Sequence, residues 1–123
     1  MKNTIIWFEI NVADLDRAKK FYDHVLQTNI RKEEMEGYPP MGIIPDEGVN
    51  GALVEDEEYE APEHSSVMLY FDGSSGINPY LERVEGAGGE VVVPRSFVNE
   101  SVGYWAAFSD LDVNLLAFYE SPQ

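Results

Sequence analysis

Glu9 is the ionisable side chain best placed to do chemistry, because it stands in the mostly apolar stretch 5–12 with Trp7 two residues before it. Successive side chains of a strand point to opposite faces, so Trp7 and Glu9 are predicted to share one face. In an apolar cavity this carboxylate would suit a general base, or the counter-charge for a cationic ligand beside the indole ring. The alternative is structural: Glu9 accepts a hydrogen bond from Tyr70 or Tyr119 and holds the sheets in register.

Few other side chains can support catalysis or metal binding. The chain has no cysteine, which excludes disulfides, thiolate metal sites and thiol nucleophiles. Its two histidines are His24, on the polar side of a predicted helix, and His64, at the end of an acidic loop. The sequence shows no nucleophile–base pair, phosphate-binding loop or nucleic-acid motif. The candidates are therefore carboxylates and aromatic side chains.

A strand that runs directly into a helix positions Trp7 and Glu9. Residues 5–12 are rich in β-branched and aromatic side chains, as expected of a strand. Asp14 suits a helix N-cap, because its carboxylate can accept hydrogen bonds from the free amides of the first turn. Apolar residues at helical spacing then predict a buried helix face made of Leu15, Ala18, Phe21, Tyr22, Val25 and Leu26.

The same order of elements is predicted a second time. Residues 67–71 are predicted to form a strand. Ser74 or Ser75 is then expected to cap a helix over 77–85, and the glycines after Ala87 are expected to end that helix. Each half continues with three strands, predicted at 30–36, 41–45 and 49–55, and at 90–97, 104–109 and 115–120. The sequence therefore predicts two βαβββ modules, 1–58 and 65–123, joined by an acidic connector.

Two segments carry a resemblance to a known family. Residues 7–26 read WFEINVADLDRAKKFYDHVL, and residues 103–114 read as an aromatic strand followed by a turn. Through these segments the chain resembles the vicinal oxygen chelate superfamily, which includes glyoxalase I, bleomycin resistance proteins and extradiol dioxygenases. The resemblance implies an α+β fold and a single domain over 1–123. In that fold, two βαβββ modules lay curved sheets around one concave cavity.

Metal-dependent members of this superfamily carry a His or Glu ligand on the first and last strand of each module. Carried over by position, the four ligands fall on Trp7, Leu53, Ser66 and Ala117. None of these side chains competes well with water for a divalent ion, so the resemblance implies a chain without the family metal and without another cofactor. A shift in register would bring other donors to these positions, namely Glu9, Glu55, His64 or Glu120.

The predicted cavity face is apolar and aromatic, which is typical of small-molecule sites. We expect a small organic ligand there, bound without a metal. One alternative is a metal-dependent lyase or dioxygenase with altered ligands, and another is a protein-interaction domain with a filled cavity. The ligand-binding candidates from strand alternation are Trp7, Glu9, Leu53, Met68, Tyr70, Ala117 and Tyr119.

The formal net charge of −15 narrows the possible partners. A chain this acidic is repelled by phosphate groups, which argues against binding to nucleic acid or to anionic membranes. The sequence shows no signal peptide and no apolar run of membrane-spanning length, so we expect a cytoplasmic location. The resemblance to bleomycin resistance proteins adds a homodimer as the expected assembly.

The turn at 110–114 departs from the family pattern. Leu111 and Val113 replace the usual Pro and Gly. A β-branched residue is disfavoured where φ is positive. We therefore expect a different turn type in this hairpin.

Overall fold

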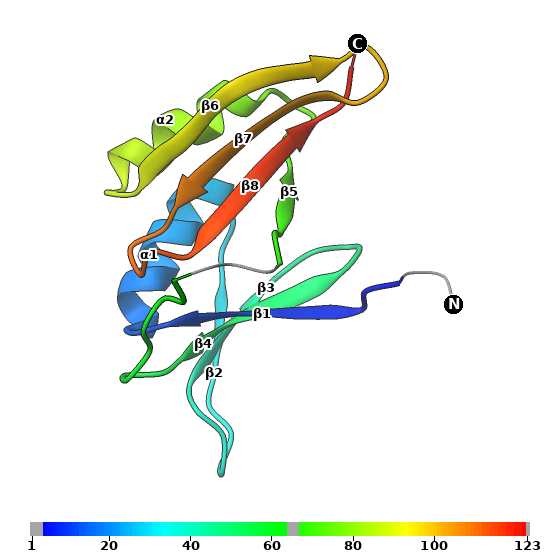
Figure 1. Ribbon diagram of the computed structural model, residues 1–123. Coiled ribbons are helices and arrows are strands. Elements are labelled where there is room, and N and C mark those ends of the chain that lie inside the picture. The colour runs from blue at the N-terminus through cyan, green and yellow to red at the C-terminus, as the bar shows by residue number, and fades with distance from the viewer. Residues whose placement is uncertain (1–3, 64–66, 123) are drawn as a thin grey trace. The chain divides into compact units, whose positions relative to one another are not determined.

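The computed structural model describes residues 4–63 and 67–122, so His64 and Ser66 lie outside the described residues. The chain divides into two compact units, 1–60 and 61–123 (Figure 1). Each unit contains four strands and one helix in the order βαβββ. This confirms the predicted α+β class and the two repeated modules.

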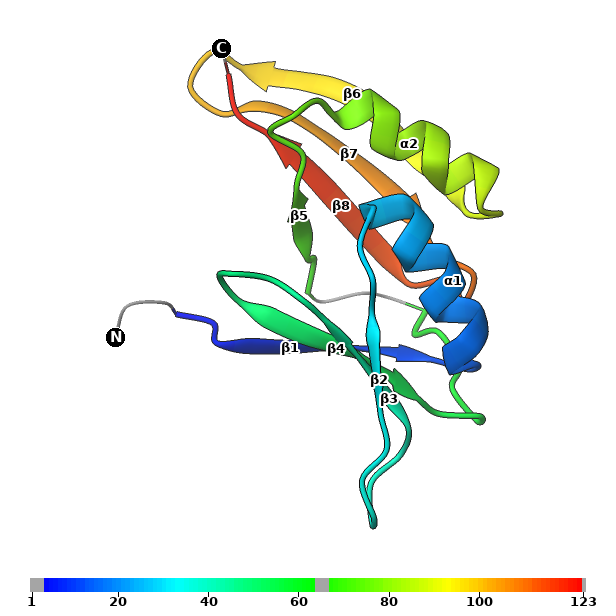
Figure 2. The same ribbon diagram turned by 180° about the vertical axis from the view of Figure 1, so that it is seen from behind.

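The first unit is a mixed sheet with one helix. Its elements are β1 (Trp7–Val12), α1 (Leu15–Leu26), β2 (Arg31–Glu33), β3 (Met41–Ile44) and β4 (Asn50–Glu55). The strand order is β1-β4-β3-β2, in which β1 runs parallel to β4 and the other neighbours are antiparallel. β2 and β3 form the antiparallel hairpin visible in Figure 2.

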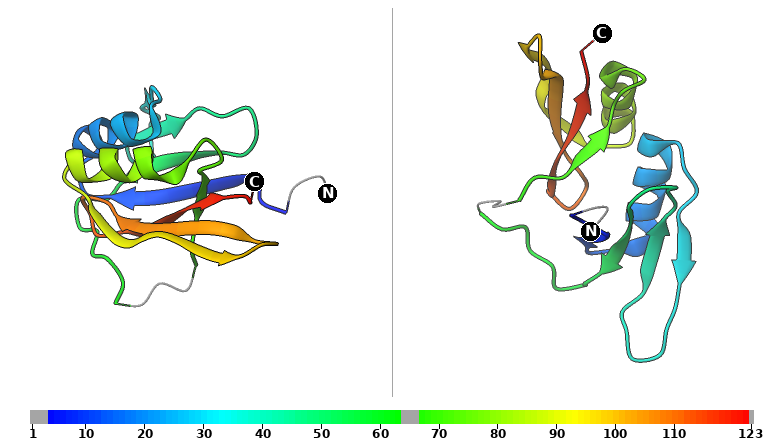
Figure 3. Two further views of the ribbon diagram at one scale, coloured as in Figure 1. Left: turned by 90° about the horizontal axis from the view of Figure 1, so that it is seen from above. Right: turned by 90° about the vertical axis from the view of Figure 1, so that its right-hand side faces the viewer.

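The second unit repeats this topology. Its elements are β5 (Tyr70–Asp72), α2 (Ile77–Gly86), β6 (Glu90–Asn99), β7 (Gly103–Ser109) and β8 (Leu115–Glu120). The order β5-β8-β7-β6 has one parallel pair, β5 with β8, as in the first unit. Figure 3 shows α2 running along one face of this sheet.

Apolar faces of the helices form the core of each unit. Most of the predicted α1 face is buried, and Gly42 of β3 lets the helix approach closely, because a Cβ there would lie 2.6 Å from Ile30 Cγ2 and 3.2 Å from Leu15 Cδ1. In the second unit Tyr80 of α2 stacks on Phe118, with ring centroids 4.7 Å apart. Such burial stabilises the fold by about 25 cal/mol per Å² of apolar area removed from water.

Helix α1 begins as predicted. The Asp14 carboxylate accepts a hydrogen bond from the Arg17 amide at 3.0 Å. A second carboxylate also serves this helix end, because Glu55 Oε2 accepts from the Leu15 amide at 2.8 Å. The first turn of α1 is therefore held both by its own cap and by the last strand of its sheet.

Helix α2 begins differently, and the prediction that Ser74 or Ser75 caps it is wrong. The N-cap residue is Gly76, which has no side chain to donate or accept. Glu120 supplies the missing acceptor, because its Oε1 accepts from the Ile77 amide at 2.9 Å. A residue distant in sequence thus satisfies a helix end that the local sequence leaves open.

Glu120 also forms an ion pair. Arg95 Nη2 donates to Glu120 Oε2 at 2.7 Å, and the guanidinium carbon lies 3.6 Å from the ring centroid of Tyr104. Hydrogen bonds from Arg95 and from the Ile77 amide lower the pKa of Glu120 below its ordinary value. Glu120 is almost fully buried, so the carboxylate joins β6, β8 and α2 inside the second unit.

The turn after β7 keeps a positive φ at Val113, so the expectation of a different turn type is wrong. Val113 has φ of 63°, and its amide donates to the Asp110 carbonyl at 3.1 Å. The buried Asp110 carboxylate fixes the turn by accepting from the amides of Asp112 and Asn114. These bonds outweigh the steric cost of a β-branched residue in the left-handed region.

Strand β6 is the longest of the described strands and forms a free edge of its sheet. Its register with β7 shifts at three places, including the step between Val93 and Ser96. Pro94, which has no amide to donate, lies inside that step. The edge is therefore bulged and does not present an unbroken row of hydrogen-bonding groups.

The helices of the described residues are α1 and α2, and neither has the length and apolar content required to cross a membrane.

Replacing Val113 by Gly is expected to raise the free energy of unfolding by about 0.5–1 kcal/mol. The left-handed conformation costs a non-glycine residue about 1–2 kcal/mol, and the extra freedom of glycine in the unfolded chain returns part of that gain. Val113 is 68% exposed, so little packing is lost. Urea unfolding measures the change. The control is Val92→Gly in β6, which should destabilise; stabilisation by both variants, or by neither, contradicts the expectation.

Glu120→Gln is expected to lower the free energy of unfolding by about 1.5 kcal/mol at pH 7, the lower end for a hydrogen bond to a charged group. The folded pKa of Glu120 is lowered, so its contribution is present above the unfolded pKa and is lost as pH falls through the folded pKa. The difference in the free energy of unfolding between the parent protein and Glu120→Gln should therefore be constant from pH 7 to about 5 and shrink in more acidic solution. Denaturant unfolding across this pH range checks it; a difference that is independent of pH would contradict the charge argument.

Candidate functional site

On the first sheet, Trp7 and Glu9 lie together on the face opposite α1. Trp7 Nε1 donates a hydrogen bond to Glu9 Oε2 at 3.1 Å, which confirms that the two side chains share a face. Trp7 is 42% exposed and Glu9 is also exposed. The donor to Glu9 is thus the indole, while the hydroxyl of Tyr119 donates to the carbonyl of Val102.

Leu53 does not share this face, and its prediction as a cavity residue is wrong. Leu53 lies beside Ile10 in the β1–β4 pair and beside Gly42 in the β3–β4 pair. Those neighbours belong to the face that α1 covers, because Leu15 of α1 fills the space at Gly42. The predicted register of β4 is wrong by one residue. Ala52, which pairs with Glu9, lies on the face opposite α1, which we call the open face.

Two glutamates identify the equivalent positions in the two sheets. Glu55 ends β4 and binds the first amide of α1, and Glu120 ends β8 and binds the first amide of α2. Counting back three residues from each gives Ala52 and Ala117. Ala117 therefore occupies the predicted place on the last strand, and Ala52 is its counterpart in the first unit.

The same register locates the first-strand positions. Tyr70 takes the place in β5 that Glu9 takes in β1, because each pairs with one of the two equivalent alanines. Counting back two residues from Glu9 gives Trp7, and counting back two residues from Tyr70 gives Met68. Met68 thus replaces Ser66, which lies outside the described residues, as the counterpart of Trp7.

The four positions at which the resembled superfamily carries its ligands do not fit a divalent metal ion. An indole, a thioether and two methyl groups offer no imidazole or carboxylate to the ion. Glu55 and Glu120 do not help, because both lie on the helix-covered faces and are bound to helix amides. Within the described ranges, no group of three or more His, Cys, Asp or Glu side chains is arranged to hold a metal. This donor set supports no metal-centred step.

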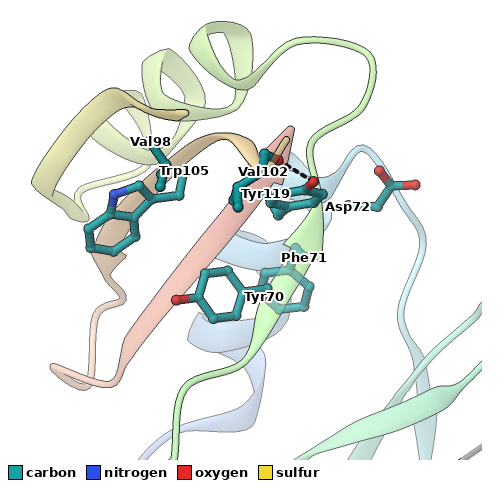
Figure 4. A pocket seen from close by; sticks show the side chains of 7 residues that line it. All are labelled: Tyr70, Phe71, Asp72, Val98, Val102, Trp105 and Tyr119. Carbon is teal, nitrogen blue, oxygen red and sulfur yellow. Dashed lines mark hydrogen bonds between the residues drawn. The ribbon is translucent and has the colours of Figure 1, made fainter. Parts of the chain in front are cut away.

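The second sheet carries a groove of about 640 Å³ on the face opposite α2 (Figure 4). Three aromatic side chains from three neighbouring strands dominate it: Tyr70 from β5, Tyr119 from β8 and Trp105 from β7. Trp105 and Tyr119 are direct cross-strand partners. The complete lining is Tyr70, Phe71, Asp72, Val98, Val102, Trp105 and Tyr119.

The groove therefore brings together two of the predicted site residues, Tyr70 and Tyr119. Ala117 lies beside Tyr70 on the adjacent strand and is fully buried, and Met68 is half-buried two residues before β5. Tyr70 itself is 55% exposed.

Few polar groups reach this groove. The hydroxyl of Tyr119 is engaged with Val102, and the Asp72 carboxylate points away from the rings of Trp105 and Tyr70 (Figure 4). Asp72 instead accepts hydrogen bonds from the side chain and the amide of Ser74, and these lower the pKa of its carboxyl group. The site is consequently an aromatic surface with an ionised group at its edge, and it is suited to stacking interactions.

Five residues that line the groove were not among the predicted site residues: Phe71, Asp72, Val98, Val102 and Trp105. Trp105 could have been found from the alternation of side chains along 103–109, had the register against the last strand been known. Val98 and Val102 lie at a hairpin whose register shift between Phe97 and Asn99 breaks the period of two, so no sequence pattern points to them.

Comparisons with known proteins place this geometry in a family. The model of the Glyoxalase/Bleomycin resistance protein/Dioxygenase superfamily matches residues 4–118. A comparison with curated protein sequences gave no match.

Several solved structures share the fold. The hypothetical protein SA1046 from S. aureus is 27% identical with a TM-score of 0.70, over 93% of this chain and 94% of that one. A glyoxalase/bleomycin resistance protein from Albidiferax ferrireducens T118 is 18% identical with a TM-score of 0.75, over 98% of this chain and all of that one.

A third structure contains a metal. It is a mutant of the fosfomycin resistance protein FosX from Listeria monocytogenes, complexed with Mn(II) and 1S,2S-dihydroxypropylphosphonic acid. It is 17% identical with a TM-score of 0.73, over 98% of this chain and 94% of that one. The family model spans nearly the whole chain, and both units carry the βαβββ topology. The chain therefore belongs to the glyoxalase/bleomycin resistance protein/dioxygenase superfamily.

Proposed function

We propose that this chain binds a flat, largely apolar organic molecule, uncharged or cationic, in the groove of the second sheet, and that binding needs no metal. The observation that carries the proposal is the convergence of Tyr70, Trp105 and Tyr119 from three neighbouring strands on one groove. Aromatic pairs contribute about 0.5–1.5 kcal/mol beyond the area that they bury, so three rings can hold a planar ligand.

The size of the groove supports a ligand of ordinary drug-like dimensions. Its volume of about 640 Å³ lies within the range of about 300–1,000 Å³ that is typical of small-molecule sites. Such sites are mostly apolar, with a few polar groups that orient the ligand. Here the candidates for that role are the Tyr70 hydroxyl and the indole N–H of Trp105.

Electrostatics favour a ligand without negative charge. No Lys, Arg or His lines the groove among the described residues, and the chain carries a formal net charge of −15. An anionic ligand would enter a repulsive field without meeting a counter-charge. This distinguishes the proposed ligand from phosphonates and other small anions.

Metal-dependent lyase or dioxygenase chemistry is the less favoured alternative. The open-face positions Trp7, Ala52, Met68 and Ala117 supply no ligand of the kind that a divalent ion requires. A homodimer and a cytoplasmic location belong to the same proposal as expectations from the sequence, and light scattering on the purified protein tests the first.

The proposal is tested with two fluorescent probes that share one ring framework. 1-Aminoanthracene is uncharged, and anthracene-1-sulfonate carries a negative charge on the same flat rings. The neutral probe should bind at least about tenfold more tightly at low salt, and the difference should narrow as salt screens the protein's charge. Fluorescence titration measures both affinities. Equal affinity for the two probes would contradict the electrostatic argument.

Matched variants locate the bound probe. Trp105→Ala should weaken binding of the neutral probe about tenfold, because one of the three rings is lost. Tyr38→Ala removes an exposed aromatic residue from the first unit, outside the groove, and should leave the affinity unchanged. The proposal fails if Trp105→Ala binds the neutral probe as the parent protein does.

Metal independence is tested by thermal unfolding in EDTA and then with Ni²⁺, Mn²⁺, Zn²⁺ and Fe²⁺ in turn. A ligand that binds only the folded state stabilises it by about 2.7 kcal/mol at a hundredfold excess over Kd, so a specific metal would raise the midpoint clearly. We expect no saturable rise with any of these ions. A saturable rise that Ala52→Asp does not alter would show that the metal binds away from the positions assigned here.

A further inference from the structure

The hairpin between β6 and β7 forms one wall of the aromatic groove. Val98 lines the groove from the end of β6, and Val102 lines it from the residue just before β7. Both side chains are exposed, at 47% and 41%. A movement of this hairpin would therefore change the width of the groove.

Val102 is held at both of its backbone polar groups. Its amide donates to Asn99 Oδ1 at 2.7 Å. The same oxygen also accepts a hydrogen bond from the Ser101 amide. The carbonyl of Val102 accepts a hydrogen bond from the hydroxyl of Tyr119 in the groove (Figure 4). The bond to Asn99 shapes the hairpin turn, whereas the bond from Tyr119 ties that turn to β8, the strand between β5 and β7.

Gly103 fixes the base of the same hairpin. It has φ of +100°, and a Cβ there would lie 2.4 Å from the Glu120 carbonyl oxygen and 2.7 Å from the Pro122 nitrogen. The backbone at Gly103 is thus packed tightly against the C-terminal end of β8. The turn beyond it, at Glu100–Val102, is exposed, and the Tyr119 hydroxyl bonds the last residue of that turn from the groove side.

We infer that Tyr119 is a positioning residue that sets the width of the groove and so selects flat ligands over bulkier ones. Its ring is part of the aromatic surface, while its hydroxyl holds Val102 over that surface. This inference rests on the proposed function, because it assigns a selectivity to the same groove. The two functions of Tyr119 separate in the variant Tyr119→Phe, which keeps the ring and removes only the hydroxyl.

The test compares two uncharged probes of different thickness. 1-Aminoanthracene is flat, whereas the two ring systems of N-phenyl-1-naphthylamine are twisted against each other. Tyr119→Phe should lower the affinity for the flat probe about threefold to tenfold, as expected for one lost hydrogen bond, and change the affinity for the twisted probe less than about twofold. The control Tyr38→Phe removes an exposed tyrosine hydroxyl outside the groove and should leave the ratio of the two affinities unchanged.

A readout that does not depend on a ligand accompanies the titrations. Hydrogen exchange at the Val102 amide should accelerate in Tyr119→Phe, while exchange at the Ala117 amide in the sheet should not change. Unchanged exchange at Val102, an equal change for both probes, or the same change of ratio in Tyr38→Phe would overturn the inference and leave the proposed function standing. If the parent protein binds neither probe, the proposed function fails and the selectivity fails with it.

Discussion

A hydrogen bond between a glutamate at the end of the last strand and the first amide of the helix organises each unit. The first amides of a helix have no partner within the helix, and a carboxylate there also interacts favourably with the helix dipole. Glu55 supplies this acceptor to α1, and Glu120 supplies it to α2. Because alternate residues of a strand face opposite ways, fixing these glutamates on the helix side also fixes which residues face the other side. The alanines three positions earlier therefore lie on the open face.

The sequence was sufficient for those features that depend on local pattern. The period of the apolar residues in 15–26 predicts α1 and nearly all of its buried face, and Asp14 predicts its start. The repeated order of elements predicts two βαβββ units, because each unit repeats the same strand and helix patterns. These features depend on contacts between residues close in sequence, and such contacts leave a readable period.

Most of the failures concern interactions between residues that are distant in sequence, and the turn at Val113 is the local exception. The cap of α2 comes from Glu120, and neither nearby serine supplies it. Leu53 was placed on the wrong face because register is set by pairing with β1 and β3, which the residues of the strand do not encode. Val113 takes a positive φ because the buried Asp110 carboxylate organises the turn around it. Two of the seven residues that line the groove, Tyr70 and Tyr119, were predicted, and Trp105 was missed because its pairing with Tyr119 was not known.

The bulged edge of β6 has a consequence for the protein in concentrated solution. A long strand with a free row of amides and carbonyls can recruit a strand of another molecule and begin an aggregate. In this chain Pro94 removes a donor from the middle of that row, and the register shifts on both sides of Val93 bend it. Valines exposed along the strand, such as Val92, can therefore remain on the surface without offering a straight edge on which a fibril could grow.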